Sequence, residues 1–317
     1  MEASTISTQQ IVNNDPIIPD KTIIEKEAFE LTKEAQKNCE KKCFLLELLK
    51  PKEKRYQKAA ELYQTSAEKY KSIKEWKKAG MSYENCGRVK ATLNDNPITY
   101  YQESYNCYIK GDSDVDERRL VDEICLNLDK NNDFYNAGQY CEKYALNVQN
   151  KKKDLDAILY YNKALDYYEK DINNPQKDLL KANIQMKLYE LMTNNNHPDA
   201  PLKVPGMLDN LGTYYINNPT MKSSAKDYFG KSILANLFYN NNVAEAKNNL
   251  NKYKQLDKDF GRSPMYYLCH DIIDSMESNN VNKIKYSIQQ YRQMNQVDEY
   301  TNNILGKMIE KTKISEF

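Results

Sequence analysis

The sequence predicts an all-α protein, a row of antiparallel helical hairpins capped by a C-terminal helical bundle. Apolar residues recur at helical spacing along most of the 317 residues. Glycine and proline are scarce, with 9 and 10 residues, and short polar breaks separate the periodic segments. No segment shows the apolar–polar alternation that is typical of a β-strand.

The clearest hairpin is predicted at residues 58–83. Ala60, Tyr63, Ala67 and Tyr70 lie three or four residues apart, so they form one stripe on a helix. Alanines alternate with tyrosines in this stripe, and a small residue leaves room for a ring from the neighbouring helix. A short polar break follows, so the next helix must fold back antiparallel.

The spacing of this stripe returns at Ala157, Tyr160, Ala164 and Tyr167. A pattern that returns at roughly forty residues, or at a multiple of forty, is typical of a solenoid. We therefore predict that residues 21–220 form a tetratricopeptide-like α-solenoid, which is a twisted sheet of antiparallel helical hairpins.

The first fifty residues divide into three parts. Residues 1–20 are polar and carry two prolines, so we expect them to be disordered. A first helix is predicted at 21–42. An apolar segment at 43–49 follows, and Pro51 separates it from the next helix.

Further helices are expected between the later breaks, at 98–109, 118–128 and 177–192. Residues 193–206 are rich in asparagine and proline, and we expect a loop there. Helices are then predicted at 223–240, 244–256, 263–278, 281–294 and 297–311. Ser263 can cap its helix and Pro264 suits the first turn. These last helices lack the small–aromatic stripe, so residues 221–311 are predicted to form a bundle, followed by a tail at 312–317.

Composition excludes several classes of protein. Lys+Arg and Asp+Glu number 46 and 45, and this balance argues against a nucleic-acid-binding protein. No signal peptide or membrane-spanning stretch is apparent. The chain has 2 histidines and no catalytic or phosphate-binding motif, so we expect no enzymatic activity and no cofactor.

The 7 cysteines are scattered. Cys39 and Cys43 could supply half of a zinc site, but no second pair or nearby histidine completes it. The alternative, which we favour, is reduced thiols that pack in a cytosolic protein, with no metal site.

Several motifs resemble the soluble NSF attachment protein (SNAP) family. The run Ser224–Phe229 is similar to its α/β branch, and Lys74, Trp76, Ala79 and Gly80 fit an early hairpin of that family. The C-terminal helices fit at Asn280, Val281, Tyr291, Asp298, Tyr300 and Leu305. The resemblance covers about residues 26–313.

This resemblance implies an adaptor rather than an enzyme. SNAPs bind the side of an assembled SNARE four-helix bundle and recruit the hexameric ATPase NSF, which pulls the bundle apart after membrane fusion. The implied role is in vesicle-mediated transport, including ER–Golgi transport, for a cytoplasmic protein that is peripheral on membranes. The alternative is a general tetratricopeptide-like scaffold that binds extended peptide segments of other partners.

The apolar segment is a candidate membrane contact. Phe44, Leu45, Leu46, Leu48 and Leu49 lie beside lysines at 41, 42, 50 and 52. Apolar side chains can enter the acyl boundary of a bilayer while lysines meet anionic headgroups. SNAPs bind membranes through a Phe-rich loop at this place. The alternative is that these residues pack onto the first hairpin.

The resemblance also places SNARE-binding positions. Lys74, Lys177, Lys181 and Lys226 fall at basic positions of the family, and SNARE bundles are acidic on their surface. The chain departs from the family at Asp133 and Gln139, where basic residues are usual. Binding could then shift to Lys143 and Lys151–Lys153, and the alternative for every such lysine is an ordinary solvated side chain.

Two carboxylates match positions at which SNAPs contact the N-terminal domain of the ATPase. Asp274 and Glu277 are three residues apart and so share one helix face. The alternative is a solvated helix face. The tail is shorter and less acidic than in α-type SNAPs, with Ile314 and Phe317 as its apolar residues.

Overall fold

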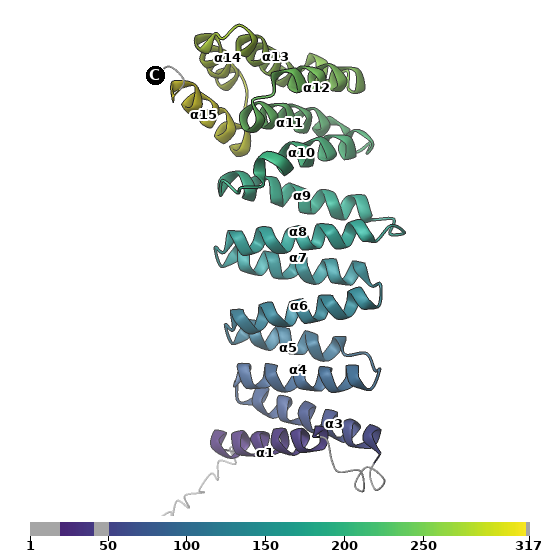
Figure 1. The fold of residues 1–317 in the computed structure, drawn as a ribbon. Helices are drawn as coiled ribbons and strands as arrows, with labels where there is room; N and C mark the ends of the chain where they lie inside the picture. The colour runs from purple at the N-terminus through teal and green to yellow at the C-terminus, as the bar shows by residue number, and fades with distance from the viewer. Residues whose placement is uncertain (1–19, 41–50, 315–317) are drawn as a thin grey trace, which may run out of the picture. The chain divides into compact units, whose positions relative to one another are not determined.

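The computed structural model describes residues 20–40 and 51–314, with side chains through Lys311. Within these ranges the chain is helical and has no β-strand (Figure 1), which confirms the all-α prediction. The helices before residue 131 are α1 (Lys21–Cys39), α3 (Lys52–Ser72), α4 (Trp76–Thr92), α5 (Ile98–Lys110) and α6 (Asp114–Lys130). The expected N-terminal disorder and the apolar segment 43–49 lie outside the described residues.

The later helices are α7 (Phe134–Asn150), α8 (Asp154–Lys170), α9 (Lys177–Asn194), α10 (Ala200–Ile216), α11 (Ala225–Asn240), α12 (Val243–Leu256), α13 (Pro264–Glu277), α14 (Val281–Met294) and α15 (Glu299–Ile314). Two short 3-10 helices precede α11 and α13, η1 at Lys222–Ser224 and η2 at Phe260–Arg262. Four of the helices expected after residue 220, α11 to α14, begin and end within two residues of their predicted bounds, and a capping side chain marks the start of the last three. Ser263, for example, accepts a hydrogen bond from the Tyr266 N–H at 3.1 Å.

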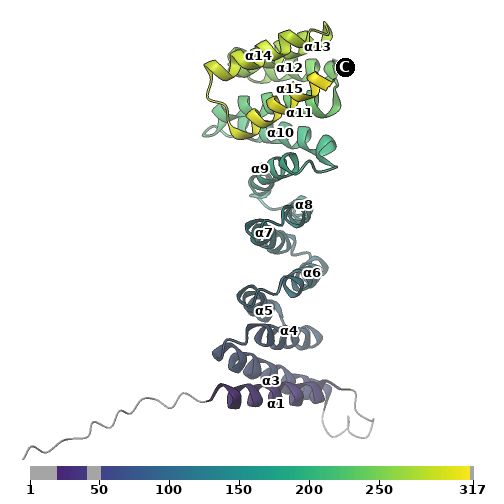
Figure 2. The ribbon, with the colours of Figure 1, turned by 90° about the vertical axis from the view of Figure 1, so that its left-hand side faces the viewer.

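The chain divides into two compact units, one ending at Ile124 and the other beginning at Cys125, both inside α6. In the first unit α1, α3, α4 and α5 pack in sequence order, and in the second unit α7 to α11 do the same (Figures 1 and 2). From α11 onward the packing changes, since α11 also contacts α13 and α15. The boundary expected near residue 220 is a different division and stays a prediction.

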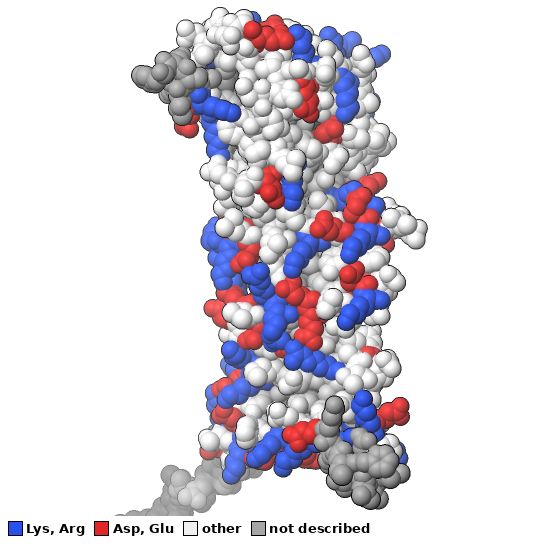
Figure 3. Space-filling view, in the orientation of Figure 1, with Lys and Arg blue, Asp and Glu red and all other residues white. Residues whose placement is uncertain are grey.

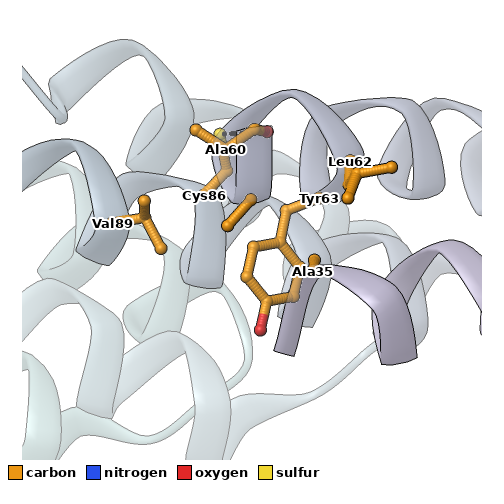
Figure 4. Close-up of a cluster of buried hydrophobic side chains, with 7 residues drawn as sticks. Ala35, Ala60, Leu62, Tyr63, Cys86 and Val89 are labelled. Atoms are coloured by element: carbon orange, nitrogen blue, oxygen red, sulfur yellow. Dashed lines mark hydrogen bonds between the residues drawn. The ribbon is translucent and has the colours of Figure 1, made fainter. Parts of the chain in front are cut away.

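The alanine–tyrosine stripe of α3 is buried, as its spacing predicts. Ala60, Tyr63, Ala67 and Tyr70 are each at most 5 % exposed. Figure 4 shows the cluster formed in the first unit, where α1, α3 and α4 meet around the Tyr63 ring. The cluster comprises Ala35, Ala59, Ala60, Leu62, Tyr63, Cys86 and Val89.

The second stripe differs from the prediction at one residue. Ala157, Tyr160 and Ala164 are buried, but Tyr167 is only half-buried, and the neighbouring Tyr168 is 1 % exposed instead. Tyr168 is buried because its ring lies against Gly138 of α7, where any Cβ would overlap the ring. Tyr167 lies near the surface, with the Lys170 ammonium 5.1 Å from its ring centre.

Two glycines that each follow an alanine, Gly80 and Gly138, lie where neighbouring helices approach closely. A Cβ on Gly80 of α4 would lie 2.6 Å from Cε1 of Tyr108 on α5, and Gly138 faces Tyr168 in the same way. Both tyrosines also donate to a glutamate four residues after the glycine. Tyr108 Oη bonds Glu84 Oε2 at 2.7 Å, and Tyr168 Oη bonds Glu142 Oε2 at 3.1 Å.

The helix-to-helix turns share one backbone conformation. A residue with positive φ follows each of several helices, at Lys74, Asn94, Asp112, Asn132, Lys152, Asn196, Asn241 and Asn279. In most of these turns the next N–H bonds a carbonyl five residues back, as between Glu75 N and Tyr70 O at 3.0 Å. This 6→1 hydrogen bond is the Schellman motif, which ends a helix and reverses the chain. The residues at 74, 94, 112, 132 and 152 recur every 18 or 20 residues, which is half of the expected repeat.

The loop expected at 193–206 is wrong, because α10 begins at Ala200 and contains Pro205. A proline within a helix leaves the carbonyl four residues before it without its hydrogen bond. Here the Asn240 side chain donates to that carbonyl, Pro201 O, at 3.4 Å. Helix α6 also begins four residues before its expected start, because Asp114, Asp116 and Glu117 favour the positive end of the helix dipole.

Candidate partner-binding surfaces

Two candidate SNARE-binding lysines, Lys177 and Lys181, lie one turn apart in the first two turns of α9. The turn after α8 places them there. The Asn174 side chain accepts from the Gln176 N–H at 2.9 Å, and the Lys177 N–H donates to the Asn174 carbonyl at 3.1 Å. This local turn starts α9 at Lys177 and brings both ammonium groups to Glu169, near the end of α8.

Glu169 binds both lysines. Its carboxylate accepts from Lys181 and lies 3.6 Å from the Lys177 Nζ, which also donates to the Glu169 carbonyl at 2.9 Å. The hydrogen bond from Lys181, followed by the charges of the two lysines, holds the pKa of Glu169 below its usual value although partial burial opposes this. The Glu169 side chain is 58 % exposed, and those of Lys177 and Lys181 are 20 % and 25 % exposed. An acidic partner therefore meets a carboxylate before it reaches the lysines.

Neighbouring opposite charges are common on the surface. On the face drawn in Figure 3, lysine and arginine side chains are interleaved with aspartate and glutamate. An example in the second unit is Lys170, which lies 3.1 Å from Asp129. On this face an acidic partner would therefore meet paired charges rather than a uniformly basic surface.

Lys226, the third candidate of the second unit, is half-buried at the start of α11. Its neighbour Asp227 is exposed, but partial desolvation raises the pKa of that carboxyl against the opposing charges of Lys226 and Lys231. Lys226 thus lies in a region where α11 carries several charges. Lys74 belongs to the first unit.

Lys74 is exposed and occupies the turn between α3 and α4. Its φ is 61°, in the left-handed region, and its N–H donates to the Lys71 carbonyl at 3.2 Å. A non-glycine residue in this region is strained by its own Cβ. Lys74 therefore has a strained backbone conformation, which reduces the stability of the fold, and an exposed ammonium group.

The two departures from the family pattern have structural roles of their own. Asp133 caps α7, because its carboxylate accepts from the Asn136 N–H at 3.3 Å. Gln139 donates to the Tyr135 hydroxyl at 2.6 Å. Asp133 contributes a helix cap where a basic residue would bring a positive charge to the positive end of the dipole.

The candidate ATPase-binding carboxylates lie in the last turn of α13, both with side chains 43 % exposed. Glu277 accepts two hydrogen bonds from Lys247 of α12, at 2.8 and 2.9 Å. Those hydrogen bonds and the charge of Glu277 raise the pKa of Lys247. Asp274 lies 3.5 Å from Nδ1 of His270. The pair is accessible, and each carboxylate has a basic neighbour.

A buried lysine surrounded by tyrosine rings, Lys231, was not predicted from the sequence. The Lys231 ammonium, on a residue only 8 % exposed, lies 5.3–5.9 Å from three tyrosine rings and 3.1 Å from Asp298. The rings belong to Tyr189 of α9, Tyr228 of α11 and Tyr300 of α15. This cluster connects three helices that are far apart in sequence, so helical periodicity alone carries no signal for it.

Several expectations cannot be placed on the described residues. The predicted membrane contact at Phe44, Leu45, Leu46, Leu48 and Leu49 lies outside them, as do Cys43 and Phe317. In the part of the chain that the structure describes, no helix is long and apolar enough to cross a bilayer. The same residues contain no cluster of histidine, cysteine or carboxylate side chains that could hold a metal ion.

The comparisons with known proteins agree with the helical architecture. The model of the family "Soluble NSF attachment protein, SNAP" matches residues 26–313. The chain is 25 % identical over 257 residues to the vesicular-fusion protein SEC17 of Komagataella phaffii, covering 80 % of this chain and 84 % of that protein. It is 25 % identical to the human alpha-soluble NSF attachment protein over 293 residues, with 91 % and 95 % of the two chains covered.

The alpha-soluble NSF attachment protein of Vitis vinifera is also similar, at 24 % identity over 83 % of this chain and 88 % of the plant protein. Because the family model spans almost the whole described chain, the relationship does not rest on one repeat. The chain belongs to the soluble NSF attachment protein family.

Proposed function

We propose that this protein is an adaptor that binds assembled SNARE complexes and recruits an NSF-type ATPase for their disassembly. The observation that carries the proposal is the family match over residues 26–313, which includes both the lysine-bearing helices and the C-terminal helices. Relatives of similar length are named as vesicular-fusion and NSF attachment proteins. The adaptor would act in vesicle fusion and intracellular protein transport and would itself catalyse no reaction.

The lysines supply the chemistry for the SNARE side. A SNARE bundle is acidic on its surface, and charged groups that match across an interface favour association and fix its register. Lys177 and Lys181 present two ammonium groups from one face of α9, held by a carboxylate that a partner can replace. The other two candidate SNARE-binding lysines are Lys74 of the first unit and Lys226 of α11.

The carboxylates of α13 supply the chemistry for the ATPase side. Asp274 and Glu277 are half-exposed in the last turn of that helix. Basic residues of an ATPase domain can replace Lys247 at Glu277, because the pair between them is exposed and such pairs contribute little stability. The interaction therefore depends on salt concentration.

The test is a pull-down with assembled SNARE complex, the ATPase and this protein, in low salt and with membranes present. The proposal predicts a ternary complex that weakens when Lys177 and Lys181 are both replaced by alanine. A protein that binds extended peptides but not the four-helix bundle would instead be a general tetratricopeptide-like scaffold. Absence of the ternary complex would reject the adaptor role.

We also propose that the apolar segment 43–49 holds the adaptor at the bilayer. Each buried large side chain contributes about 1.5–3 kcal/mol, so a few inserted residues give weak, reversible attachment. Replacing Phe44, Leu45, Leu48 and Leu49 by serine should reduce activity on SNAREs embedded in liposomes and leave activity on soluble SNAREs unchanged. Equal loss on both substrates would show that these residues belong to the folded core.

A further inference from the structure

Two cysteines lie side by side near the start of the second unit. Cys125, in the last turns of α6, and Cys141 of α7 have their sulfur atoms 3.3 Å apart. Both are buried, with Cys125 4 % exposed and Cys141 fully covered. Cys125 also contacts the Ala137 carbonyl, at 3.5 Å, so its side chain points towards α7.

The distance is short enough for a bond to form with little rearrangement. A disulfide has a sulfur–sulfur length of about 2.05 Å, so the two atoms need to approach by roughly 1.3 Å. Small rotations of the two side chains can supply this approach. Two other buried cysteines, Cys86 and Cys269, also contact carbonyl oxygens, those of Ala60 and Gly230.

We propose that Cys125 and Cys141 form a reversible disulfide when a hydroperoxide reaches the protein. The Cys125 thiolate attacks one peroxide oxygen, the O–O bond breaks, and hydroxide leaves and takes up a proton to become water. Cys125 is then a sulfenic acid. The Cys141 thiolate attacks the Cys125 sulfur, the S–O bond breaks, and a second water leaves.

The balance is two thiols and one hydrogen peroxide giving one disulfide and two waters. The two sulfurs lose two electrons in total, and the peroxide gains them. Cys125 reacts first because it is the more exposed of the two thiols. An excess of small-molecule thiol reverses the change by thiol–disulfide exchange.

The disulfide would join α6 to α7 across the turn between them, with Cys125 before the turn and Cys141 after it. The Asp133 N–H already bonds the Leu128 carbonyl at 2.9 Å in this turn. A disulfide shortens the covalent path between the two helices and restricts their separation. Amide exchange in residues 125–141 should therefore slow on oxidation and recover on reduction.

The test uses the full chain carrying Cys39→Ser and Cys43→Ser, which removes the pair that is close in sequence. The native protein is treated with hydrogen peroxide, its remaining thiols are alkylated in denaturant, and its peptides are analysed by mass spectrometry. We expect the loss of two free thiols and one cross-linked peptide joining Cys125 to Cys141, both reversed by dithiothreitol. Cys141→Ser should abolish this linkage.

Cys86→Ser is the matched control and should leave the linkage intact. Burial raises the pKa of Cys86 to about 12 and that of Cys107 to about 11, so in the proteins that retain them each should remain an alkylatable thiol. The inference is overturned if Cys125 and Cys141 stay alkylatable at peroxide doses that oxidise Cys39 in the unaltered chain. Cross-links distributed at random over the buried cysteines would overturn it as well.

Discussion

Glu169 of α8 accepts a hydrogen bond from Lys181 of α9, and the same carboxylate lies 3.6 Å from Lys177. Two of the four candidate SNARE-binding lysines are therefore already paired with a single carboxylate of their own chain, which offsets one of their two positive charges. An acidic partner must displace Glu169 or share the lysines with it. The exposed glutamate also repels an approaching carboxylate.

Glu169→Gln should strengthen binding to the acidic SNARE complex. The substitution removes the competing charge and leaves a side chain of similar size. Exposed ion pairs contribute about 0.2–1 kcal/mol, so we expect affinity to rise up to about fivefold at low salt. The measurement is a titration of labelled SNARE complex, repeated at high salt, where the gain should disappear.

The control for this substitution is Asp129→Asn in the same unit. Asp129 pairs with Lys170 at 3.1 Å, and Lys170 is not a candidate contact. Unchanged affinity is expected for this variant. If both variants bind more tightly to the same degree, the effect reflects net charge and not release of Lys177 and Lys181.

Lys74→Gly should stabilise the fold while it weakens SNARE binding. Lys74 has a φ of 61°, and glycine adopts this conformation without the strain that a Cβ causes. We expect the free energy of unfolding to rise by about 1 kcal/mol in denaturant titrations. Binding should fall because the ammonium group is lost.

Asn94→Gly is the backbone control, because Asn94 lies in the same unit with a φ of 60° and is not a candidate contact. Asparagine tolerates this conformation better than lysine, so we expect a smaller gain in stability and no loss of binding. A Lys74→Gly protein that is stabilised and binds normally would remove Lys74 from the interface.

Gly80→Ala should destabilise the first unit. The added Cβ would lie 2.6 Å from the Tyr108 ring, and that ring is held by its hydrogen bond to Glu84. Overpacking of this kind costs about 1–3 kcal/mol. Thermal unfolding measures the effect, and Gly206→Ala is the control, because a Cβ there meets no atom within 4 Å.

Asp298→Asn should destabilise the second unit at neutral pH and have little effect in acid. Burial alone would raise the pKa of Asp298, but hydrogen bonds from Thr301 and the charge of Lys231 outweigh it and lower that pKa. A carboxyl with a lowered folded pKa contributes stability above its unfolded pKa, about 3.9, and loses it as pH falls through the folded value.

The expected loss at neutral pH is about 1 kcal/mol, reduced by the 50 % exposure of the Asp298 side chain. Urea titrations between neutral pH and pH 3 measure it. The difference between the two proteins should shrink below about pH 4. A constant difference down to pH 3 would show that the loss comes from the α15 cap and not from the charge.

Local rules account for most of the helices. The buried stripe of Ala60, Tyr63, Ala67 and Tyr70 follows from helical spacing, and the bounds of α14 follow from the cap at Asn280. The α10 helix was missed because its proline is compensated by Asn240, which is distant in sequence. The contacts of Glu169 and of Lys231 could not be predicted from helical spacing either, because they join different helices and depend on how those helices pack.

The most direct test of the adaptor role is disassembly of a SNARE complex by an NSF-type ATPase and ATP, with and without this protein. We predict that disassembly requires the protein and falls when Asp274 and Glu277 are replaced by alanine or when Lys177 and Lys181 are. Disassembly that proceeds equally well without the protein, or that does not occur when it is added, would contradict the account.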